Sequence, residues 1–159
     1  MFKKILVPLD GSELAAKILP KVVELAKCFS GQITLLHVCN FSEEATKQLL
    51  PIKLEKDAKE SVIKTCATFL GKVSNELQMQ GVDVTHVCIE GMPAREIIIY
   101  ASENKMDLIA MATHGKGEVA WILGSTAEKV VTHASVPTLL FRVMETGVLN
   151  LKETIIGMP

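Results

Sequence analysis

The sequence predicts an α/β fold in which helices flank both faces of a five-stranded parallel sheet. Short apolar runs rich in β-branched residues alternate with longer amphipathic stretches, which is the pattern of repeated βαβ units. The chain of 159 residues has the size of one domain, and a globule of that length buries roughly 70% of its unfolded surface. We therefore expect one domain over residues 1–143 and a short C-terminal arm over residues 144–159.

The first half of the chain predicts two strands, each followed by a helix. The first strand covers residues 4–9, and Ser12 is the expected N-cap of a helical stretch in which apolar residues recur at helical spacing. The second strand covers residues 33–39 and is almost continuously apolar, as expected of a strand covered on both faces. A long amphipathic helix follows over residues 54–80, and Gly81 ends it.

The second half repeats this alternation. A third strand over residues 84–89 leads to Pro93, which suits the first turn of a further helix. The fourth strand covers residues 107–112 and is followed by a glycine-bearing loop. The remaining elements are a helix over residues 125–133 and a fifth strand over residues 138–143.

The C-terminal residues 144–159 are too apolar for a disordered tail and too few for a second domain. Two placements remain open for them. They form either an arm that packs on a partner subunit or a terminal strand folded back on its own domain.

The near balance of charge limits the classes of partner. The chain has 17 basic and 18 acidic residues, so it has no basic field that would attract nucleic acid or an anionic membrane. Apolar runs such as residues 5–9 are far shorter than the ~20 residues that span a bilayer, and the first residues lack the pattern of an export signal. We expect a soluble, cytoplasmic protein that binds neither nucleic acid nor membranes.

The four cysteines, Cys28, Cys39, Cys66 and Cys88, form no CxxC pair and no short Cys/His spacing that is typical of a zinc site. Cys39 and Cys88 lie in apolar, strand-like stretches. We therefore expect free buried thiols rather than a disulfide, which suits a reducing cytosol, and we predict no metal site.

The loop before the helix at residues 125–133 carries the strongest functional signal. It ends in Gly124, Ser125 and Thr126, where backbone N–H groups have no acceptor within the helix and carry the positive end of its dipole. Glycine also lets a ligand approach the backbone closely. This arrangement is able to bind phosphate, but from spacing alone the commoner role of glycines between a strand and a helix is only to turn the chain.

Four motifs in order resemble the universal stress protein family over residues 2–143. The loop is similar to that family's nucleotide loop, Gly-x2-Gly-x9-Gly-(Ser/Thr), preceded by an Asp-Leu-Ile-x-Met strand at residues 107–111. The other marks are Ile5-Leu6-Val7-Pro8-Leu9-Asp10-Gly11-Ser12, Leu35-Leu36-His37-Val38 and Gly91-Met92-Pro93-Ala94. The resemblance implies a Rossmann-like fold of the adenine nucleotide alpha hydrolase type, and a homodimer formed through the edge strand from Thr138 to Val143.

The resemblance also implies an ATP site beyond the carboxyl ends of the strands, where ligands settle in such sheets. In relatives that hold ATP, the adenine and ribose contact the residues that match Pro8, Asp10 and Val38. The residues that match the ribose and phosphate positions are Met111, Ala112, Gly115, Gly124, Ser125 and Thr126. Mg²⁺ would be held only through the phosphates, because the loop offers no carboxylate cluster.

Two positions depart from the family's loop. Ala112 stands where the motif has its first glycine, and eight residues separate Gly115 from Gly124 where the pattern has nine. The missing residue removes up to about 3.5 Å of reach. Two functions therefore stay open: an ATP-binding regulatory module of the stress response with slow or no hydrolysis, or a dimeric interaction protein of the same family that binds no nucleotide.

The sequence shows no positioned catalytic group, which disfavours an adenylating or ATP-hydrolysing enzyme. His37 lies in an apolar strand and is expected to be a core residue with a satisfied hydrogen bond. His114 and Lys116 flank the loop and face either a phosphate or solvent. No residue is assigned a catalytic role.

Overall fold

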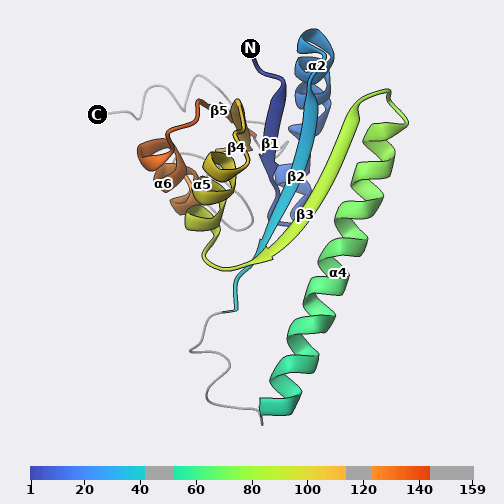
Figure 1. Ribbon diagram of the computed structural model, residues 1–159, viewed down its shortest axis with the longest axis vertical. Coiled ribbons are helices and arrows are strands. Elements are labelled where there is room, and N and C mark those ends of the chain that lie inside the picture. Colours follow the sequence, from blue (N-terminus) through green and yellow to red (C-terminus); the bar gives the residue numbers. More distant parts are fainter. Residues whose placement is uncertain (42–51, 114–122, 144–159) are drawn as a thin grey trace, which may run out of the picture.

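The computed structural model describes residues 1–41, 52–113 and 123–143 as an α/β fold built on one parallel sheet (Figure 1). The five strands lie in the order β3-β2-β1-β4-β5, and each pair of neighbours is parallel. The predicted fold class is therefore confirmed. The strands are β1 (Lys4–Pro8), β2 (Gln32–Cys39), β3 (Asp83–Glu90), β4 (Leu108–Ala112) and β5 (Thr138–Phe141).

Helices cover both faces of this sheet. The helices on one face are α1 (Glu13–Ala16), α2 (Leu19–Phe29) and α4 (Ile52–Gln78), and those on the other are α5 (Pro93–Glu103) and α6 (Ser125–His133). Figure 1 shows α4 running along β3, and α5 beside α6 on the other side of the sheet. The strand order reverses between β1 and β4, because β2 and β3 extend the sheet in one direction and β4 and β5 in the other.

Successive residues of β1 point to opposite faces of the sheet and enter different parts of the core. Ile5 and Val7 pack with residues of α2 and α4, whereas Leu6 packs with Ile97 of α5 and Val130 of α6. All five side chains are buried. Because both faces are covered, both sets of strand residues are apolar, which explains why the central strands are continuous apolar runs in the sequence.

The first helical stretch is divided where the sequence predicts one continuous helix. Ser12 caps α1 as predicted, because its Oγ accepts a hydrogen bond from the backbone N–H of Ala15 at 3.1 Å. Pro20 lies in the first turn of α2. Proline has no N–H and its ring crowds the carbonyl four residues earlier, so it fits the start of a new helix and not the interior of a continuous one.

The other predicted elements agree with the observed ones to within two residues at each end that was predicted. Helix α6 begins at Ser125 and ends at His133, as predicted. Gly81, with φ +83°, turns the chain from the end of α4 toward β3. Strand β5 is shorter than expected: it ends at Phe141, and Val143 lies beyond it as a buried residue.

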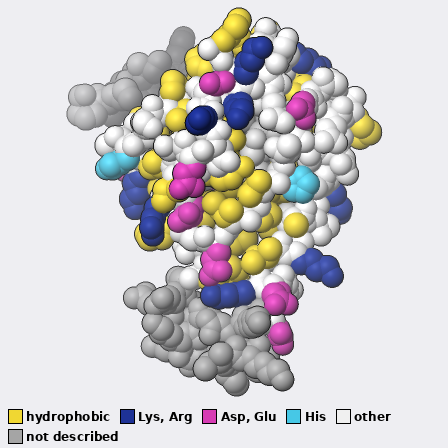
Figure 2. All heavy atoms as spheres, viewed as in Figure 1, with side chains coloured by type: hydrophobic (Ala, Val, Ile, Leu, Met, Phe, Trp, Pro, Cys, Tyr) yellow, Lys and Arg dark blue, Asp and Glu magenta, His cyan; other side chains and the backbone are white. Residues whose placement is uncertain are grey.

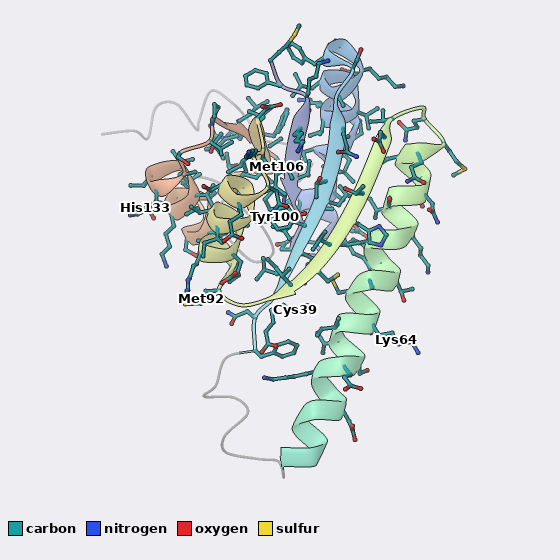
Figure 3. All side chains as sticks on the ribbon, viewed as in Figure 1. Cys39, Lys64, Met92, Tyr100, Met106 and His133 are labelled. Atoms are coloured by element: carbon teal, nitrogen blue, oxygen red, sulfur yellow. A yellow bond between two sulfur atoms is a disulfide. The ribbon has the colours of Figure 1, made fainter. Side chains whose placement is uncertain are left out.

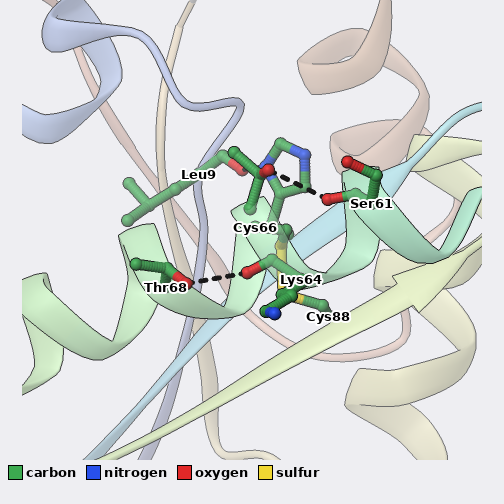
Figure 4. Close-up of a disulfide and its surroundings, with 8 residues drawn as sticks. Leu9, Ser61, Lys64, Cys66, Thr68 and Cys88 are labelled. Atoms are coloured by element: carbon green, nitrogen blue, oxygen red, sulfur yellow. Dashed lines mark hydrogen bonds between the residues drawn. A yellow bond between two sulfur atoms is a disulfide. The ribbon is translucent and has the colours of Figure 1, made fainter. Parts of the chain in front are cut away.

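The cysteines correct the sequence prediction. Cys66 and Cys88 form a disulfide that links α4 to β3, with their Cα atoms 6.5 Å apart (Figure 4). Packing of α4 on β3 brings together two residues 22 positions apart in the sequence, which residue spacing does not reveal. Cys28 is a free thiol but exposed, so the expectation of buried free thiols is confirmed for Cys39 alone. Burial and the nearby Glu90 raise the pKa of the Cys39 thiol, so Cys39 stays protonated at neutral pH.

Charged side chains of both signs surround a strip of hydrophobic side chains in the middle of the face shown in Figure 2. Neither sign dominates this face, in agreement with the balanced composition of 17 basic and 18 acidic residues. Within the described ranges, none of the helices combines the length and hydropathy needed to cross a bilayer.

Candidate functional site

A pocket of about 240 Å³ opens at the carboxyl ends of β1 and β4. The strand order reverses here, and in open α/β sheets the diverging connections leave a crevice at such a point. Figure 3 shows Cys39, the last residue of β2, and Met92, the N-cap of α5, at this end of the sheet. The described lining residues are Pro8, Leu9, Asp10, Ala15, Leu36, His37, Val38, Pro93, Ile97, Met111, Ala112, Gly124, Thr126 and Ala127.

Asp10 brings a carboxyl group to the exposed rim of this pocket, just after β1. Its Oδ1 accepts hydrogen bonds from the backbone N–H of Ser12 at 2.9 Å and from the Ser12 hydroxyl. The same hydroxyl oxygen caps α1. Asp10 is therefore held in place by the turn that begins α1, where a ligand hydroxyl can donate to it.

His37 lines the pocket from β2 and is half-buried. Its Nδ1 lies 2.8 Å from the carbonyl oxygen of Leu9. Because a carbonyl oxygen only accepts, Nδ1 must carry the proton, and Nε2 remains without a proton in the neutral ring. The expected satisfied hydrogen bond is confirmed, but His37 also forms part of the pocket wall.

The first turn of α6 closes another side of the pocket. Gly124 is its N-cap and no side chain caps the turn, so the backbone amides of the following residues have no side-chain acceptor among the described residues. The amide of Gly124 itself donates to the carbonyl oxygen of Thr113 at 2.8 Å. Of the three residues predicted to bind phosphate through their amides, Gly124 is thus already engaged.

The same hydrogen bond joins two residues on either side of the segment 114–122, which lies outside the described residues. Thr113 immediately follows β4, and Gly124 immediately precedes α6. The start of α6 is therefore fixed relative to β4 even though the segment is one residue shorter than the family's pattern.

The structure brings most of the predicted site residues to one pocket. Seven of them line it: Pro8, Asp10, Val38, Met111, Ala112, Gly124 and Thr126. Ser125 is exposed in the first turn of α6 and is not among the lining residues, while Gly115, His114 and Lys116 lie outside the described residues. The binding roles of all the predicted site residues stay predictions.

Sequence reasoning missed the contribution of the β3–α5 connection. Pro93 and Ile97 of α5 line the pocket opposite β1 and β4 residues. The signal was present, because the motif Gly91-Met92-Pro93-Ala94 follows β3 at the same edge of the sheet as the end of β1. All carboxyl ends of parallel strands meet at one edge, so the start of α5 belongs there.

The described lining is mainly apolar and carries a few polar groups, as is typical of small-molecule sites. Asp10 and His37 are the titratable residues among the described lining residues. A divalent cation needs several oxygen ligands, and the described lining offers one carboxylate.

A model of the universal stress protein family matches residues 1–142, nearly all of the folded domain. The chain belongs to the universal stress protein family. The resemblance seen in its four motifs is thereby confirmed. This universal stress protein is 31% identical over 149 residues to universal stress protein MJ0531 of Methanocaldococcus jannaschii, covering 89% of this chain and 83% of that protein. It is 32% identical over 152 residues to a universal stress protein of Thermus aquaticus, covering 89% of this chain and all of that protein.

Solved structures of the family share this fold. The structure of the protein MJ0577 superposes with a TM-score of 0.74 at 29% identity, over 92% of this chain and 99% of that one. Universal stress protein UspA of Lactobacillus plantarum gives the same TM-score of 0.74 at 22% identity, over 89% and 98% of the two chains. This universal stress protein therefore has the five-stranded parallel sheet of its family.

Proposed function

We propose that this universal stress protein binds ATP in the pocket and acts as a regulatory module of the stress response, with slow or no hydrolysis. One observation carries the proposal: a single pocket joins the carboxyl group of Asp10 to the start of α6. A nucleoside phosphate presents hydroxyl donors at one end and anionic oxygens at the other. The pocket offers a carboxylate acceptor at Asp10 for the hydroxyl groups and the start of α6 for the anionic oxygens.

The nucleotide lies across the end of the sheet in this proposal. Adenine packs against the apolar wall that contains Pro8 and Val38, and the ribose hydroxyls donate to Asp10. Met111 and Ala112 lie at the end of β4 on the path from the ribose to α6. The phosphates reach the amides of Ser125 and Thr126, where the helix dipole favours negative charge.

The volume of the pocket supports a nucleotide whose base and ribose lie inside it and whose phosphates lie outside it. About 240 Å³ is slightly below the roughly 300–1,000 Å³ typical of small-molecule sites, so it suits the base and ribose while the phosphates extend outward along the start of α6. Gly115, outside the described residues, is the remaining predicted phosphate contact. Mg²⁺ would be bound through the phosphate oxygens.

Some family members are known with nucleotides. One solved universal stress protein structure is a complex with cAMP, and one from Archaeoglobus fulgidus is a complex with dAMP. These chains are 15% and 16% identical to this one, so the likeness extends to the fold. The pocket, rather than this likeness, supports a nucleotide in this chain.

We also propose a homodimer formed through the edge strand. β5 ends the sheet on one side, and an unpaired edge must be covered or paired to prevent indiscriminate association. Leu139 on this strand is 37% exposed, which is unusual for a large apolar strand residue and supports a partner at this edge. Residues 144–159, outside the described residues, follow β5 and would form the arm that packs on the partner.

The predicted cytoplasmic location is kept as part of this proposal, and it rests on the sequence alone. Free thiols no longer support it, because Cys66 and Cys88 form a disulfide.

Calorimetric titration of the whole chain with ATP and MgCl₂ tests the nucleotide proposal. We compare the wild type with Asp10→Asn, which keeps an acceptor for Ser12 but removes the charge, and with Asp83→Asn as a matched control. Asp83 is the first residue of β3, at the opposite end of the sheet, and its carboxylate accepts a hydrogen bond from the Gln32 side chain at 2.9 Å. A hydrogen bond to a charged group contributes about 1.5–3 kcal/mol, so we expect Asp10→Asn to weaken binding roughly tenfold or more and Asp83→Asn to leave it unchanged.

Two results would contradict the proposal. Flat titrations, together with no nucleotide released from the heat-denatured protein, would favour the interaction protein that binds no nucleotide. Equal weakening by both variants would show that ATP does not contact the rim at Asp10. Phosphate release at a rate typical of enzymes would instead indicate a hydrolase.

A further inference from the structure

Four side chains with metal-binding atoms gather between α4 and the sheet, and one of them, His37, also lines the pocket. Ring and sulfur atoms of His37, Cys39 and Cys66 lie within 4.8 Å of one another, and the sulfur of Cys88 is bonded to that of Cys66. The sequence showed no such cluster, because its members come from β2, α4 and β3.

The sheet itself presents three of these residues on one face. His37 and Cys39 are two positions apart on β2, so their side chains point the same way. Cys88 is directly opposite His37 in the parallel register of β2 and β3. Cys66 approaches this face from α4, and Figure 4 shows the bond that joins it to Cys88.

These distances are close to those of a tetrahedral zinc site. With Zn–S bonds of about 2.3 Å and Zn–N bonds of about 2.0–2.1 Å, the ligand atoms of such a site are about 3.6–3.8 Å apart. The three atoms within 4.8 Å need to approach by roughly one ångström, which side-chain torsions can supply. Cys66 and Cys88 need the opposite change, because two sulfurs at bonding distance cannot both coordinate one ion.

The hydrogen bond of His37 prepares its ring for a metal. Nδ1–H donates to the carbonyl oxygen of Leu9, so the lone pair of Nε2 is the one available to coordinate. Metal-bound histidines usually donate their other N–H to a carbonyl or carboxylate in this way, which fixes the tautomer and the ring orientation.

We propose that reduction of the Cys66–Cys88 disulfide turns this cluster into a closed Zn²⁺ site with the ligands His37, Cys39, Cys66 and Cys88. A phosphine or dithiol reductant supplies the two electrons; with a phosphine and one water, the products are two thiols and the phosphine oxide. Zn²⁺ then replaces the protons of three thiols, releases three H⁺ and leaves a coordinated ion with a net charge of −1.

Zinc and the disulfide are thus alternative crosslinks between α4 and the sheet. Three thiolates and one imidazole form a common ligand set of structural zinc sites, and soft thiolates disfavour Mg²⁺ and Ca²⁺. Cys39 and Cys66 are 3% and 7% exposed, so the coordinated ion would be shielded from water, as in sites that stabilise a fold.

Cobalt titration of the full chain tests this proposal. The protein is reduced with a phosphine under argon, desalted and titrated with Co²⁺, which reports thiolate coordination by a near-ultraviolet charge-transfer band and tetrahedral geometry by visible d–d bands. We expect saturation at one equivalent, loss of the bands when Zn²⁺ is added, and no bands in the oxidised protein. A reduced protein that shows no thiolate band would overturn the proposal.

Two single variants separate the site from adventitious thiol binding. Cys39→Ser removes a ligand without touching the disulfide, and we expect it to weaken metal binding at least about tenfold. Cys28→Ser removes the exposed thiol on α2 and is expected to bind like the wild type. Far-ultraviolet circular dichroism of the oxidised variants checks that both fold. Bands that survive in Cys39→Ser with unchanged affinity, or that vanish in Cys28→Ser, would refute the assignment.

Discussion

Cleavage of the disulfide between Cys66 and Cys88 should lower the free energy of unfolding by an amount set by the length of the loop that the disulfide closes. The two cysteines are 22 residues apart, and closing a loop of that length in the unfolded chain corresponds to about 3.4 kcal/mol at 25 °C in the chain-entropy model. For a chain of this size, 1 kcal/mol shifts Tm by about 2–4 °C. Reduction should therefore lower Tm by about 7–14 °C.

The assay is thermal and urea unfolding followed by circular dichroism, with a chelator present so that no metal binds the free thiols. Wild type is measured oxidised and reduced, beside the double variant Cys66→Ala/Cys88→Ala. The reduced wild type and the variant should have the same lowered Tm, and the variant should not respond to reductant. The urea m-value should rise on reduction, because the unfolded chain becomes less compact.

Cys28→Ala is the control, because an exposed thiol on α2 contributes little to stability. Two results would contradict this prediction: a change of less than about 1 kcal/mol in the free energy of unfolding on reduction, or a double variant that remains sensitive to reductant. The first result would mean that the crosslink does not restrict the unfolded chain, and the second that the effect of reductant has a source other than this disulfide.

Three further predictions follow from other parts of the fold. Gly81→Ala should lower the free energy of unfolding by about 1–2 kcal/mol, because a residue with a side chain is strained at its φ of +83°. Gly71→Ala inside α4 should raise it by about 0.5–1 kcal/mol, because the new methyl group meets only a histidine ring at 3.8 Å. Urea unfolding of both variants checks these opposite signs. Asp107 accepts two backbone hydrogen bonds at the start of β1, at 2.8 and 2.9 Å, and these lower its pKa. The ionised carboxylate of Asp107 therefore stabilises the fold fully above the ordinary carboxyl pKa of about 3.9, and this stabilisation is lost as the pH falls through the lower pKa of the folded protein. The difference in free energy of unfolding between wild type and Asp107→Asn should shrink below about pH 4 and stay constant from pH 5 to 7. Leu139→Asp should halve the mass measured by light scattering if β5 forms the dimer, while Met79→Asp, which replaces an exposed residue just after α4, should not change it; an unchanged mass in both would exclude this interface.

Much of the fold could be predicted from the sequence because both faces of the sheet are covered. Residues such as Leu6 and Val7 are both buried, on opposite faces, so each central strand forms an apolar run that is easily recognised. Helix α6 was located to the residue, because Gly124 and Ser125 mark its start. The division between α1 and α2 was missed because the apolar spacing continues across it, and the decisive signal was Pro20.

The candidate site could be predicted only in part, for a physical reason. Residues at strand ends, such as Pro8 and Met111, were found because the parallel topology gathers strand ends at one edge. The wall from α5 and the cluster at Cys66 depend on how a helix packs on the sheet, and a spacing pattern does not encode that contact. His37 was understood correctly as a hydrogen-bonded strand residue, but its position in the pocket wall required the structure.

The hydrogen bond from the Gly124 amide to the Thr113 carbonyl has a practical consequence for protein engineering. Since this bond pins both ends of the intervening segment, extra residues grafted there would leave the anchors in register with the sheet. Each doubling of the length of a flexible loop costs only about 0.6 kcal/mol. Lengthening this segment is therefore expected to cost the fold little stability, so a change in ATP affinity on insertion would report on the predicted phosphate contact at Gly115.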